Sequence, residues 1–493
     1  MQEPASFLEP ATPGISGRPE GVEVNKPGFL GRRLQGLQRR WQAIAGAEYD
    51  EKTAGLRPHL PPEDRPHVGE LMRQSLDPRG GEILARSRAA ALGRVYLTLN
   101  ETGRSEFLRM LAQDFDLEAA AVKKALADLN AAKTSGARRK ARQALVQATD
   151  PPRTTILTRF NALPQGVKFL VDLRADLLPL VKGDAVLASL DDDLKGLLAS
   201  WFDVDFLQLR RISWNTASGA LLEKFMAYEA VHPVESWEDL KNRLDHDRRY
   251  FAFFHPRMPD EPLIFLEVAL VRGMAGNIQE LLDPSAPVGD PRKADTAIFY
   301  SISNAQKGLA GISFGGFLIK RVVDELAQEF PGLRTFATLS PLPGFRKWLE
   351  GGLRKDEGLF RPAEIKQTRK WVAEEETNQW FGGVLRDALW REDKGIERAV
   401  KTALLRLAAR YLTAESRSGG GALDPVAHFH LSNGATVERL NWEADVSEKG
   451  MKQSAGIMVN YLYNSRRIEE NHEAYKGRGK VTTSPSLKNL LKG

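Results

Sequence analysis

The sequence predicts an α+β protein, in which an all-helical N-terminal domain is followed by an α/β catalytic domain. Apolar residues recur with helical spacing from residue 29 to about residue 165. After residue 166, short β-branched and aromatic runs alternate with helical segments. A chain of 493 residues is also too long for one hydrophobic core, so at least two domains are expected.

The composition excludes several classes of function. The chain has no cysteine, so a thiol nucleophile, a thiolate zinc site, an iron–sulfur cluster and a disulfide are ruled out. The net charge of +6 suits a polyanionic small molecule, and no nucleic-acid-binding signature accompanies it. No apolar run approaches about 18 residues, so no membrane span is expected. The N-terminal residues fit no secretory signal or transit peptide, which favours the cytoplasm.

Three segments are expected along the chain. Residues 1–28 are rich in Pro, Gly and Glu and are predicted to be a disordered tail. Residues 29–165 form the helical domain, in which Ser105 and Asp116 are predicted to cap successive helices. Residues 166–493 form the catalytic domain. Its predicted strands are 250–254, 263–271, 296–302, 426–431, 437–442 and 456–463.

The segment 295–326 has the pattern of a strand, a glycine-rich turn and a helix start. The apolar strand pattern breaks at Ser303, and a helical pattern begins at Phe317. The glycines between them are Gly308, Gly311, Gly315 and Gly316. Free backbone N–H groups at a helix N-terminus bind anions, and glycine lets a diphosphate approach the main chain. We expect a pyrophosphate cradle here, with Ser303 beside the chemistry; the structural alternative is that Ser303 caps the helix.

Two histidines supply the second chemical feature. His428 and His430 stand in a predicted strand that ends in an Asn-Gly turn, so their side chains would share one face. They are interpreted as hydrogen-bonded strand histidines, as metal ligands, or as a general acid–base group near neutral pH. No third ligand stands at a suitable spacing for a metal. The spacing does not decide between the other two.

Six ordered blocks of this sequence resemble the malonyl-CoA decarboxylase family, most strongly over residues 166–463. The blocks are HPVESW (232–237), AIFYSIS with QKGLAGI (297–312), FLIKRVVDEL (317–326), FATLSPLPGFRKWL (336–349), PVAHFHLSNGA (425–435) and NWEADVSEKG (441–450). The resemblance implies a helical oligomerisation domain and a GNAT acetyltransferase-like catalytic domain. It also implies a homotetramer, built as a dimer of dimers, that converts malonyl-CoA to acetyl-CoA and carbon dioxide.

The resemblance implies a Ser/His pair, which falls on Ser303 and His430. His428 departs from the asparagine of the family and could share the role of His430. The implied substrate-binding residues are Met274, Ala275, Gly276, Asn277, Ile278, Gln279, Gln306, Gly308, Leu309, Gly311 and Ile312. No metal and no separate cofactor is implied, because CoA is part of the substrate.

The chemistry agrees with these residue types. A malonyl thioester loses carbon dioxide readily when donors stabilise the enolate oxygen, a dry pocket disfavours the solvated carboxylate, and an acid protonates C2. Ser303 is expected to contact the carboxylate or enolate, and His430 to donate the proton. Glu267 is interpreted as a paired buried carboxylate or a pocket acid, and Tyr461 and Tyr463 as core residues or an acid. A CoA-dependent acyltransferase of the GNAT type is the alternative function.

Overall fold

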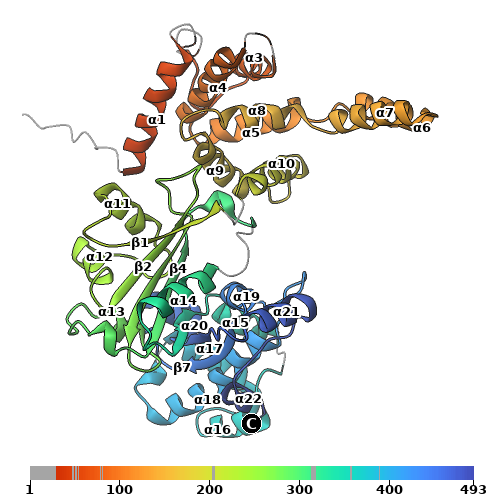
Figure 1. The fold of residues 1–493 in the computed structure, drawn as a ribbon. Coiled ribbons are helices and arrows are strands. Elements are labelled where there is room, and N and C mark those ends of the chain that lie inside the picture. The colour runs from red at the N-terminus through yellow and green to blue at the C-terminus, as the bar shows by residue number, and fades with distance from the viewer. Residues whose placement is uncertain are drawn as a thin grey trace, which may run out of the picture.

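The computed structural model in Figure 1 places a helical domain above a domain that is built on one sheet. It describes residues 29–46, 49, 53, 55–77, 79, 81–202, 206–312, 318–355, 358–387 and 389–492. The predicted disordered tail, residues 1–28, lies outside these residues. So do Gly315, Gly316 and Phe317 of the predicted glycine-rich turn.

The N-terminal domain consists of helices around one apolar core, as the helical spacing predicts. Trp41 is fully buried, and its ring meets that of Phe169 edge-on at 4.9 Å. A Cβ at Gly93 would lie 2.1 Å from the Trp41 ring, so this close packing requires glycine. The helices are α1 Phe29–Ala45, α3 Arg65–Leu76, α4 Gly81–Thr98, α5 Glu101–Asp114, α6 Ala119–Ala131, α7 Ser135–Ala148, α8 Pro152–Phe160, α9 Gly166–Leu177 and α10 Ala185–Trp201.

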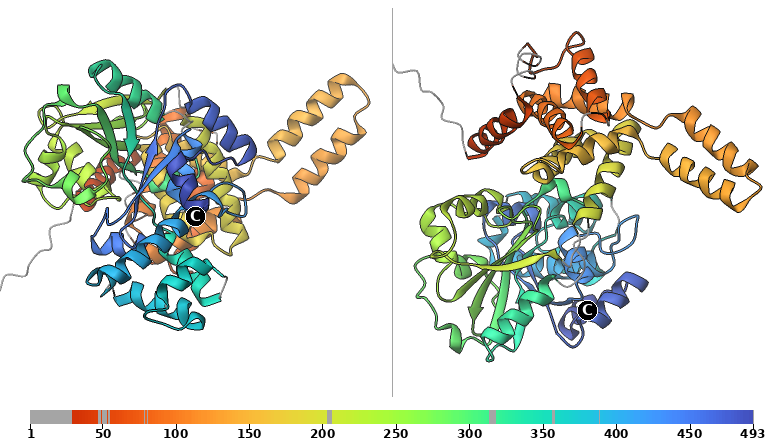
Figure 2. Two further views of the ribbon diagram at one scale, coloured as in Figure 1. Left: turned by 90° about the horizontal axis from the view of Figure 1, so that it is seen from below. Right: turned by 45° about the horizontal axis from the view of Figure 1, so that its top comes forward.

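Two helix starts differ from the prediction. Asn100 caps α5, since its side chain accepts a hydrogen bond from the backbone N–H of Gly103 at 3.0 Å. Ser105 lies inside that helix, so its predicted capping role is wrong. Helix α6 has Glu118 at its N-cap, so the predicted capping role of Asp116 is wrong. The Asp116 carboxylate instead accepts a hydrogen bond from the backbone N–H of Leu117, which precedes the helix. Helices α6 and α7 pack together as an arm that projects from the domain in Figures 1 and 2.

A mixed sheet forms the centre of the second domain. Its strand order is β1-β2-β3-β4-β5-β8-β6, with β7 also paired to β8. Neighbouring strands are antiparallel, except for β4 and β5. The strands are β1 Gln208–Ile212, β2 Arg248–Phe254, β3 Ile264–Val271, β4 Thr296–Asn304, β5 Thr335–Thr338, β6 Ser340–Pro341, β7 Thr436–Asn441 and β8 Met458–Leu462. All predicted strands except 426–431 are confirmed, with small shifts at their ends.

Strands β4 and β5 diverge after a short parallel ladder. The ladder ends where Phe299 pairs with Thr338. Beyond this point β4 continues along β3 to Asn304, whereas the chain after β5 enters β6, which pairs with β8. The separation of two parallel neighbours leaves an edge of β4 that β5 does not cover.

A β-bulge in β4 determines which face of the sheet each later side chain occupies. Phe299 pairs with Val268 of β3, but Ser303 pairs with Phe265, because the register shifts beside Tyr300. Paired residues point to the same face, and residues three apart on β3 point to opposite faces. Ser303 therefore faces the core under helix α11, Gly219–Tyr228, and Phe299 faces the opposite core.

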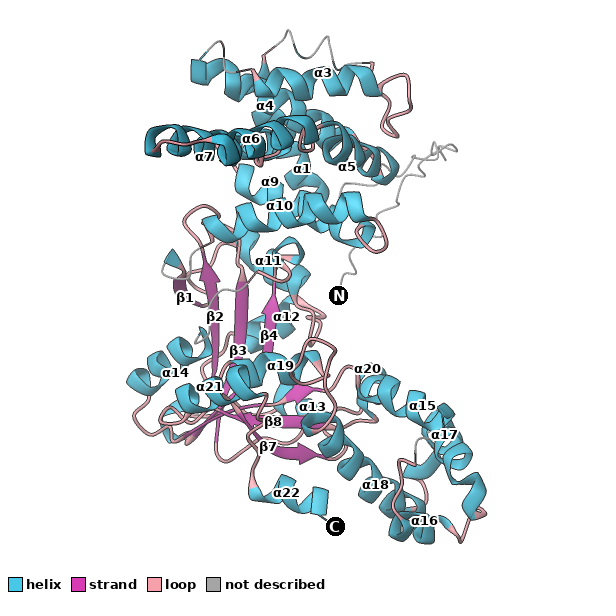
Figure 3. Cartoon of the chain, turned by 90° about the vertical axis from the view of Figure 1, so that its right-hand side faces the viewer, coloured by secondary structure: helices cyan, strands magenta, loops and turns pink. Residues whose placement is uncertain are grey.

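The remaining helices surround this sheet, as Figure 3 shows. They are α12 Trp237–Arg243, α13 Ile278–Leu282, α14 Leu318–Glu329, α15 Phe345–Lys355, α16 Pro362–Thr368, α17 Thr377–Asp387, α18 Lys394–Thr413, α19 Pro425–Ser432, α20 Glu448–Ser454, α21 Ile468–Arg478 and α22 Pro485–Lys492. The predicted strand 426–431 is wrong, because it lies in α19. None of the described helices is long and apolar enough to cross a bilayer.

Helix α9 joins the helical domain to the sheet domain at the turn after β4. The Arg174 guanidinium, which is almost fully buried, donates to the carbonyl oxygens of Gly308 at 2.7 Å and Ala310 at 2.8 Å. A Cβ at Gly308 would lie 1.7 Å from the carbonyl oxygen of Val171 in α9. Close packing between the domains therefore requires glycine at this position.

We predict that Gly308→Ala lowers the free energy of unfolding by about 1–3 kcal/mol, because the added methyl group forces α9 away from the turn. Denaturant unfolding followed by circular dichroism measures the change. Gly219→Ala is the matched control, since a Cβ there meets no described heavy atom within 4 Å. Equal stability of the two variants would contradict this packing account.

Candidate active site

His430 lies in α19, a helix of two turns whose start is fixed by Asp424 and Pro425. The Asp424 carboxylate accepts hydrogen bonds from the backbone N–H groups of Val426 and Ala427, both at 2.9 Å. Asp at the N-cap followed by Pro at the first helical position is a helix-start pattern. The helix places the His430 ring inside the protein, with 3% of the residue exposed.

Both ring nitrogens of His430 have hydrogen-bond partners. Nε2 lies 3.1 Å from Oγ of Ser340, and Nδ1 lies 2.8 Å from the hydroxyl of Tyr463. Ser340 donates to Oγ1 of Thr338 at 2.8 Å, which leaves its oxygen to accept from Nε2–H. Nδ1 then accepts from the Tyr463 hydroxyl, so the network defines the tautomer with hydrogen on Nε2.

The sheet positions the partners of His430. Ser340 pairs with Val459 of β8, and Tyr463 directly follows β8 and bonds through its N–H to the carbonyl oxygen of Phe336 at 2.8 Å. Tyr461, on the same face of β8, stacks on the imidazole with 4.5 Å between ring centroids. Strand β8 therefore fixes both tyrosines and the register of Ser340.

The site is electrically neutral near pH 7. Burial lowers the pKa of His430 to about 3, so the imidazole is uncharged. Burial also raises the pKa of Tyr461 and of Tyr463 well above the usual value of 10.0, so both phenols keep their protons. The site thus offers N–H and O–H donors from neutral groups in dry surroundings, where such donors act strongly on developing negative charge.

Ser303 has partners that belong to a different network. Its hydroxyl donates to the Glu229 carboxylate at 3.1 Å, and Ser301 donates to the same carboxylate at 2.9 and 2.8 Å. Glu229 also accepts from the backbone N–H groups of residues 231 and 232, so it ties the following loop to β4. Because the bulge turns Ser303 to the α11 face, the structure does not bring Ser303 and His430 together as a pair.

His428 also lies apart from His430. Two positions along a helix differ by about 200° in direction, so the prediction that both side chains share one face is wrong. Nδ1 of His428 lies 2.8 Å from the Tyr475 hydroxyl, which accepts from the backbone N–H of Ala422 at 2.7 Å. Tyr475 of α21 therefore holds both His428 and the preceding loop. The described residues contain no metal-ligand cluster of three or more His, Asp or Glu.

The segment 274–279, predicted to bind substrate, is held by β7 and β8. Carbonyl oxygens of Met274 and Ala275 accept from Arg439 at 2.9 and 3.2 Å, and that of Ala275 also accepts from Asn460 at 3.0 Å. A Cβ at Gly276 would lie 2.9 Å from Oδ1 of Asn441. These contacts anchor the segment beside the sheet edge.

The second half of this segment starts helix α13. Asn277 caps the helix by accepting from the backbone N–H of Glu280 at 3.1 Å, and Ile278 is buried. Gln279 donates to the Asp445 carboxylate at 2.9 Å. Each of these side chains therefore has a structural contact, and substrate binding by the segment stays a prediction.

The predicted pyrophosphate cradle has a mixed environment. Gln306 donates to the carbonyl oxygen of Pro262 at 2.8 Å, while Leu309 and Ile312 are buried in the core. Gly311 has a positive φ of 74°, and a Cβ there would lie 3.6 Å from Nζ of Lys195 in α10. A backbone turn with a nearby ammonium group is suited to an anion.

Glu267 is confirmed as a paired buried carboxylate. It lies 3.3 Å from the Arg243 guanidinium, and its residue is fully buried. Burial, with the charge of Glu229 as a second cause, raises the pKa of Glu267 to about 8. Its face of the sheet is the one that Ser303 occupies, so it lies outside the His430 network.

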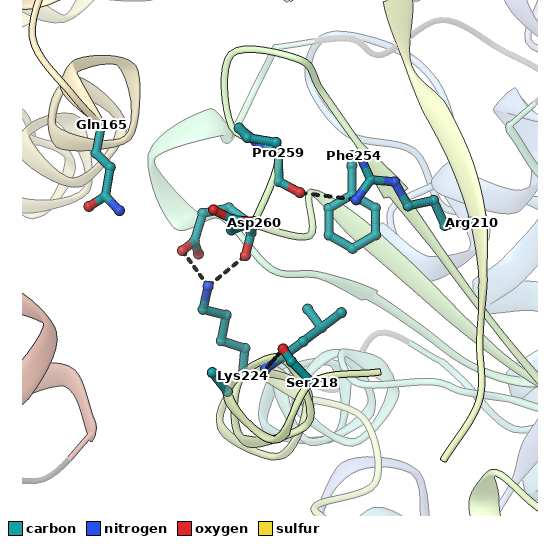
Figure 4. A pocket seen from close by; sticks show the side chains of 10 residues that line it. Gln165, Arg210, Ser218, Lys224, Phe254, Pro259 and Asp260 are labelled. Carbon is teal, nitrogen blue, oxygen red and sulfur yellow. Dashed lines mark hydrogen bonds and ion pairs between the residues drawn. The ribbon is translucent and has the colours of Figure 1, made fainter. Parts of the chain in front are cut away.

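A separate pocket of about 320 Å³ lies between β1, the end of β2 and α11, and Figure 4 shows it. The positive charge of Lys224 in this pocket is balanced by a partner, because its ammonium pairs with Glu261 at 2.8 Å and donates to the carbonyl oxygen of Asp260 at 2.5 Å. Neither Ser340 nor His430 is among the residues that line it. The pocket is therefore distinct from the His430 site.

Comparisons with known proteins define the class of this two-domain chain. Residues 115–202 match the family model "Malonyl-CoA decarboxylase N-terminal domain", and residues 205–493 match "Malonyl-CoA decarboxylase C-terminal domain". A mitochondrial malonyl-CoA decarboxylase of Mus musculus is 37% identical over 505 residues, covering 97% of both chains. The matches over both domains thus show that the chain is an enzyme of the carboxy-lyase class.

Solved structures agree with this result. Malonyl-CoA decarboxylase from Rhodopseudomonas palustris has a TM-score of 0.77 and 39% identity, and that from Agrobacterium vitis has 0.76 and 42%. Each comparison covers 86% of this chain and 99% of the solved one. The chain belongs to the malonyl-CoA decarboxylase family.

Sequence reasoning did not identify Ser340 as a candidate. This serine stands inside the block FATLSPLPGFRKWL, which carries part of the family resemblance. The available signal was a serine before a proline, two residues after the end of β5, where the chain leaves one strand and enters the next. Tyr463 was expected in the core or at its rim, and it is buried, but its bond to His430 has no sequence signature.

We predict that His430 makes the protein less stable as the pH falls from 7 to 5. Its folded-state pKa of about 3 lies below the usual 6.5. Between these two values the imidazole is protonated in the unfolded chain and neutral in the folded chain. The loss is roughly 2 kcal/mol over this interval. Glu267 has a raised pKa, so its protonation stabilises the folded protein as the pH falls. The effect of His430 is therefore measured as the difference between the wild type and a His430 variant.

Urea unfolding at several pH values should show a weaker loss of stability on acidification in His430→Gln than in the wild type. His246→Gln removes an exposed histidine and is the matched control, with the wild-type dependence expected. An identical pH dependence in wild type and His430→Gln would show that the imidazole is not held neutral by the fold.

Proposed function

We propose that this chain decarboxylates malonyl-CoA to acetyl-CoA and carbon dioxide, with Ser340 and His430 at the reacting centre. The observation that carries the proposal is the 3.1 Å contact between Oγ of Ser340 and Nε2 of His430 in a buried, neutral site. Family membership supplies the substrate class. Ser340 takes the role that the resemblance gave to Ser303, and His430 keeps its own.

Each step of the reaction has a suitable group. When the bond between C2 and the carboxylate breaks, its electron pair moves into an enolate and charge collects on the thioester oxygen. When the thioester binds, the Ser340 hydroxyl turns its hydrogen from Oγ1 of Thr338 to that oxygen and stabilises it as a donor. The enolate then takes a proton at C2 from Nε2–H of His430, which a neutral imidazole can supply to so strong a base. Tyr463, bonded to Nδ1, returns a proton to the ring from its other side. One proton from solvent then restores the Tyr463 hydroxyl and the starting tautomer of His430, so that each turnover consumes one proton.

We infer that the sheet domain adopts a GNAT acetyltransferase-like fold and that CoA enters where β4 and β5 diverge. Support comes from the parallel β4–β5 pair, whose ladder ends at Thr338, the hydrogen-bond partner of Ser340. The turn with Gln306, Gly308, Leu309, Gly311 and Ile312 then receives the diphosphate. The ammonium group of Lys195 beside Gly311 favours the same ligand.

The remaining parts of the proposal concern partners and place. CoA is part of the substrate, so no metal, separate cofactor or nucleic acid takes part. The helical domain is proposed to build a homotetramer as a dimer of dimers. The cytoplasm is the proposed location, although the related mouse protein is named mitochondrial.

We predict that Ser340→Ala and His430→Gln each lower kcat for malonyl-CoA decarboxylation by about 10²–10⁴, because they remove the enolate donor and the acid. Ser303→Ala should stay within about threefold of the wild type, since its hydroxyl serves Glu229. Chromatography of acetyl-CoA and capture of carbon dioxide measure the reaction.

The assay is run with and without an amine acceptor. Transfer of the acyl group to the amine, with no acetyl-CoA from malonyl-CoA, would replace the decarboxylase with the acyltransferase alternative. A loss in Ser303→Ala as large as in Ser340→Ala would return the catalytic role to Ser303. Circular dichroism of all variants shows whether each one is folded.

A further inference from the structure

Asp424 connects the two chain segments that carry Ser340 and His430. Its side chain is fully buried, with no exposed surface. One carboxylate oxygen, Oδ1, caps α19 through two backbone N–H groups. The other, Oδ2, accepts from the hydroxyl of Tyr411 in α18 at 3.2 Å.

Gly344, four residues beyond Ser340, lies beside this carboxylate, since a Cβ at Gly344 would lie 3.9 Å from Oδ2 of Asp424. A Cβ at Gly344 would lie 2.3 Å from the Tyr411 hydroxyl, so this crossing of three segments is closely packed. Tyr411 is itself held by the rings of Phe345 at 5.8 Å and Trp348 at 5.4 Å. The carboxylate thus accepts hydrogen bonds from α18 and α19, and it packs against the chain after β6.

These contacts bear on the geometry of the reacting pair. Helix α19 has two turns, so its first hydrogen bonds and its cap decide where the helix begins. His430 stands one and a half turns after Asp424, and its Nε2 must meet a hydroxyl on a separate strand. A displacement of about 1 Å at such a pair can change a rate by about 10²-fold.

We propose that Asp424 is a positioning residue, which holds the His430 helix and the Ser340 strand in register through its bonds to α19 and Tyr411 and its packing against Gly344. It touches neither the substrate nor the reacting atoms. The inference rests on the proposed function for its effect on catalysis. Its effect on the placement of His430 is independent of that function.

The first measurement therefore needs no substrate. Diethyl pyrocarbonate modifies accessible neutral imidazoles, and fragment-ion mass spectrometry separates His430 from His428 on the same peptide. We expect His430 to react about tenfold faster in Asp424→Ala than in the wild type, because α19 opens more often. Asp424→Asn should stay within about threefold, since asparagine also caps helices and can bond the Tyr411 hydroxyl.

Asp184→Ala is the matched control. Asp184 caps α10 through two backbone N–H groups at 3.1 Å and pairs with Arg109 at 2.7 Å, so it has a comparable structural role away from His430. Unchanged His430 reactivity in Asp424→Ala, or an equal rise in Asp184→Ala, would overturn the proposal. If Asp424→Ala does not fold, Tyr411→Phe removes one donor and decides by the same criterion.

The second measurement uses malonyl-CoA. In Asp424→Ala, kcat should fall at least about tenfold with KM within about threefold, and Asp424→Asn should restore most of it. A loss of stability without this change in kcat would leave Asp424 as a cap only and refute the positioning role. A wild-type protein that does not decarboxylate malonyl-CoA would refute the proposed function, while the His430 reactivity would still test Asp424.

Discussion

His430 can occupy the interior only as a neutral imidazole with both nitrogens bonded, because an unpaired charge or donor there carries a large desolvation cost. The two partners come from different parts of the chain: Ser340 follows β5 and Tyr463 follows β8. The ring itself comes from α19. Three segments must therefore be correctly placed at once, and the proposed chemistry requires all three placements.

Strand β8 determines most of this placement. It pairs with β5, β6 and β7, so it sets the register of Ser340 and also carries Tyr461 beside the imidazole. The parallel pair β4–β5 ends next to these residues. In the proposed mechanism, the thioester enters between these diverging strands, while the buried network around His430 stays intact. The donors would then be held rigid apart from the entry path, as preorganised electrostatic stabilisation requires.

The sequence predicted the parts of the fold that depend on local patterns. Helical spacing gave the N-terminal domain, and β-branched runs gave the strands that form β2, β3, β4, β7 and β8. The error at 426–431 was avoidable, because Asp424 followed by Pro425 is a helix-start pattern that outweighs alternation over a few residues. The candidacy of His430 came from a family block and stays a prediction, whereas the strand geometry expected for it is wrong, because it lies in a helix.

The choice between Ser303 and Ser340 depends on a feature without a local signature. Simple alternation along β4 would place Ser303 on the same face as Phe299, which is the face of His430. The bulge beside Tyr300 inserts one residue and turns Ser303 to the other face, towards Glu229. A bulge is set by the pairing of two strands, so the sequence of β4 alone does not contain it. Thr338 pairs with Phe299 and so points to the same face of the sheet. Ser340 lies two residues further along the chain with no bulge between them, so its side chain points to that face too, where the imidazole lies.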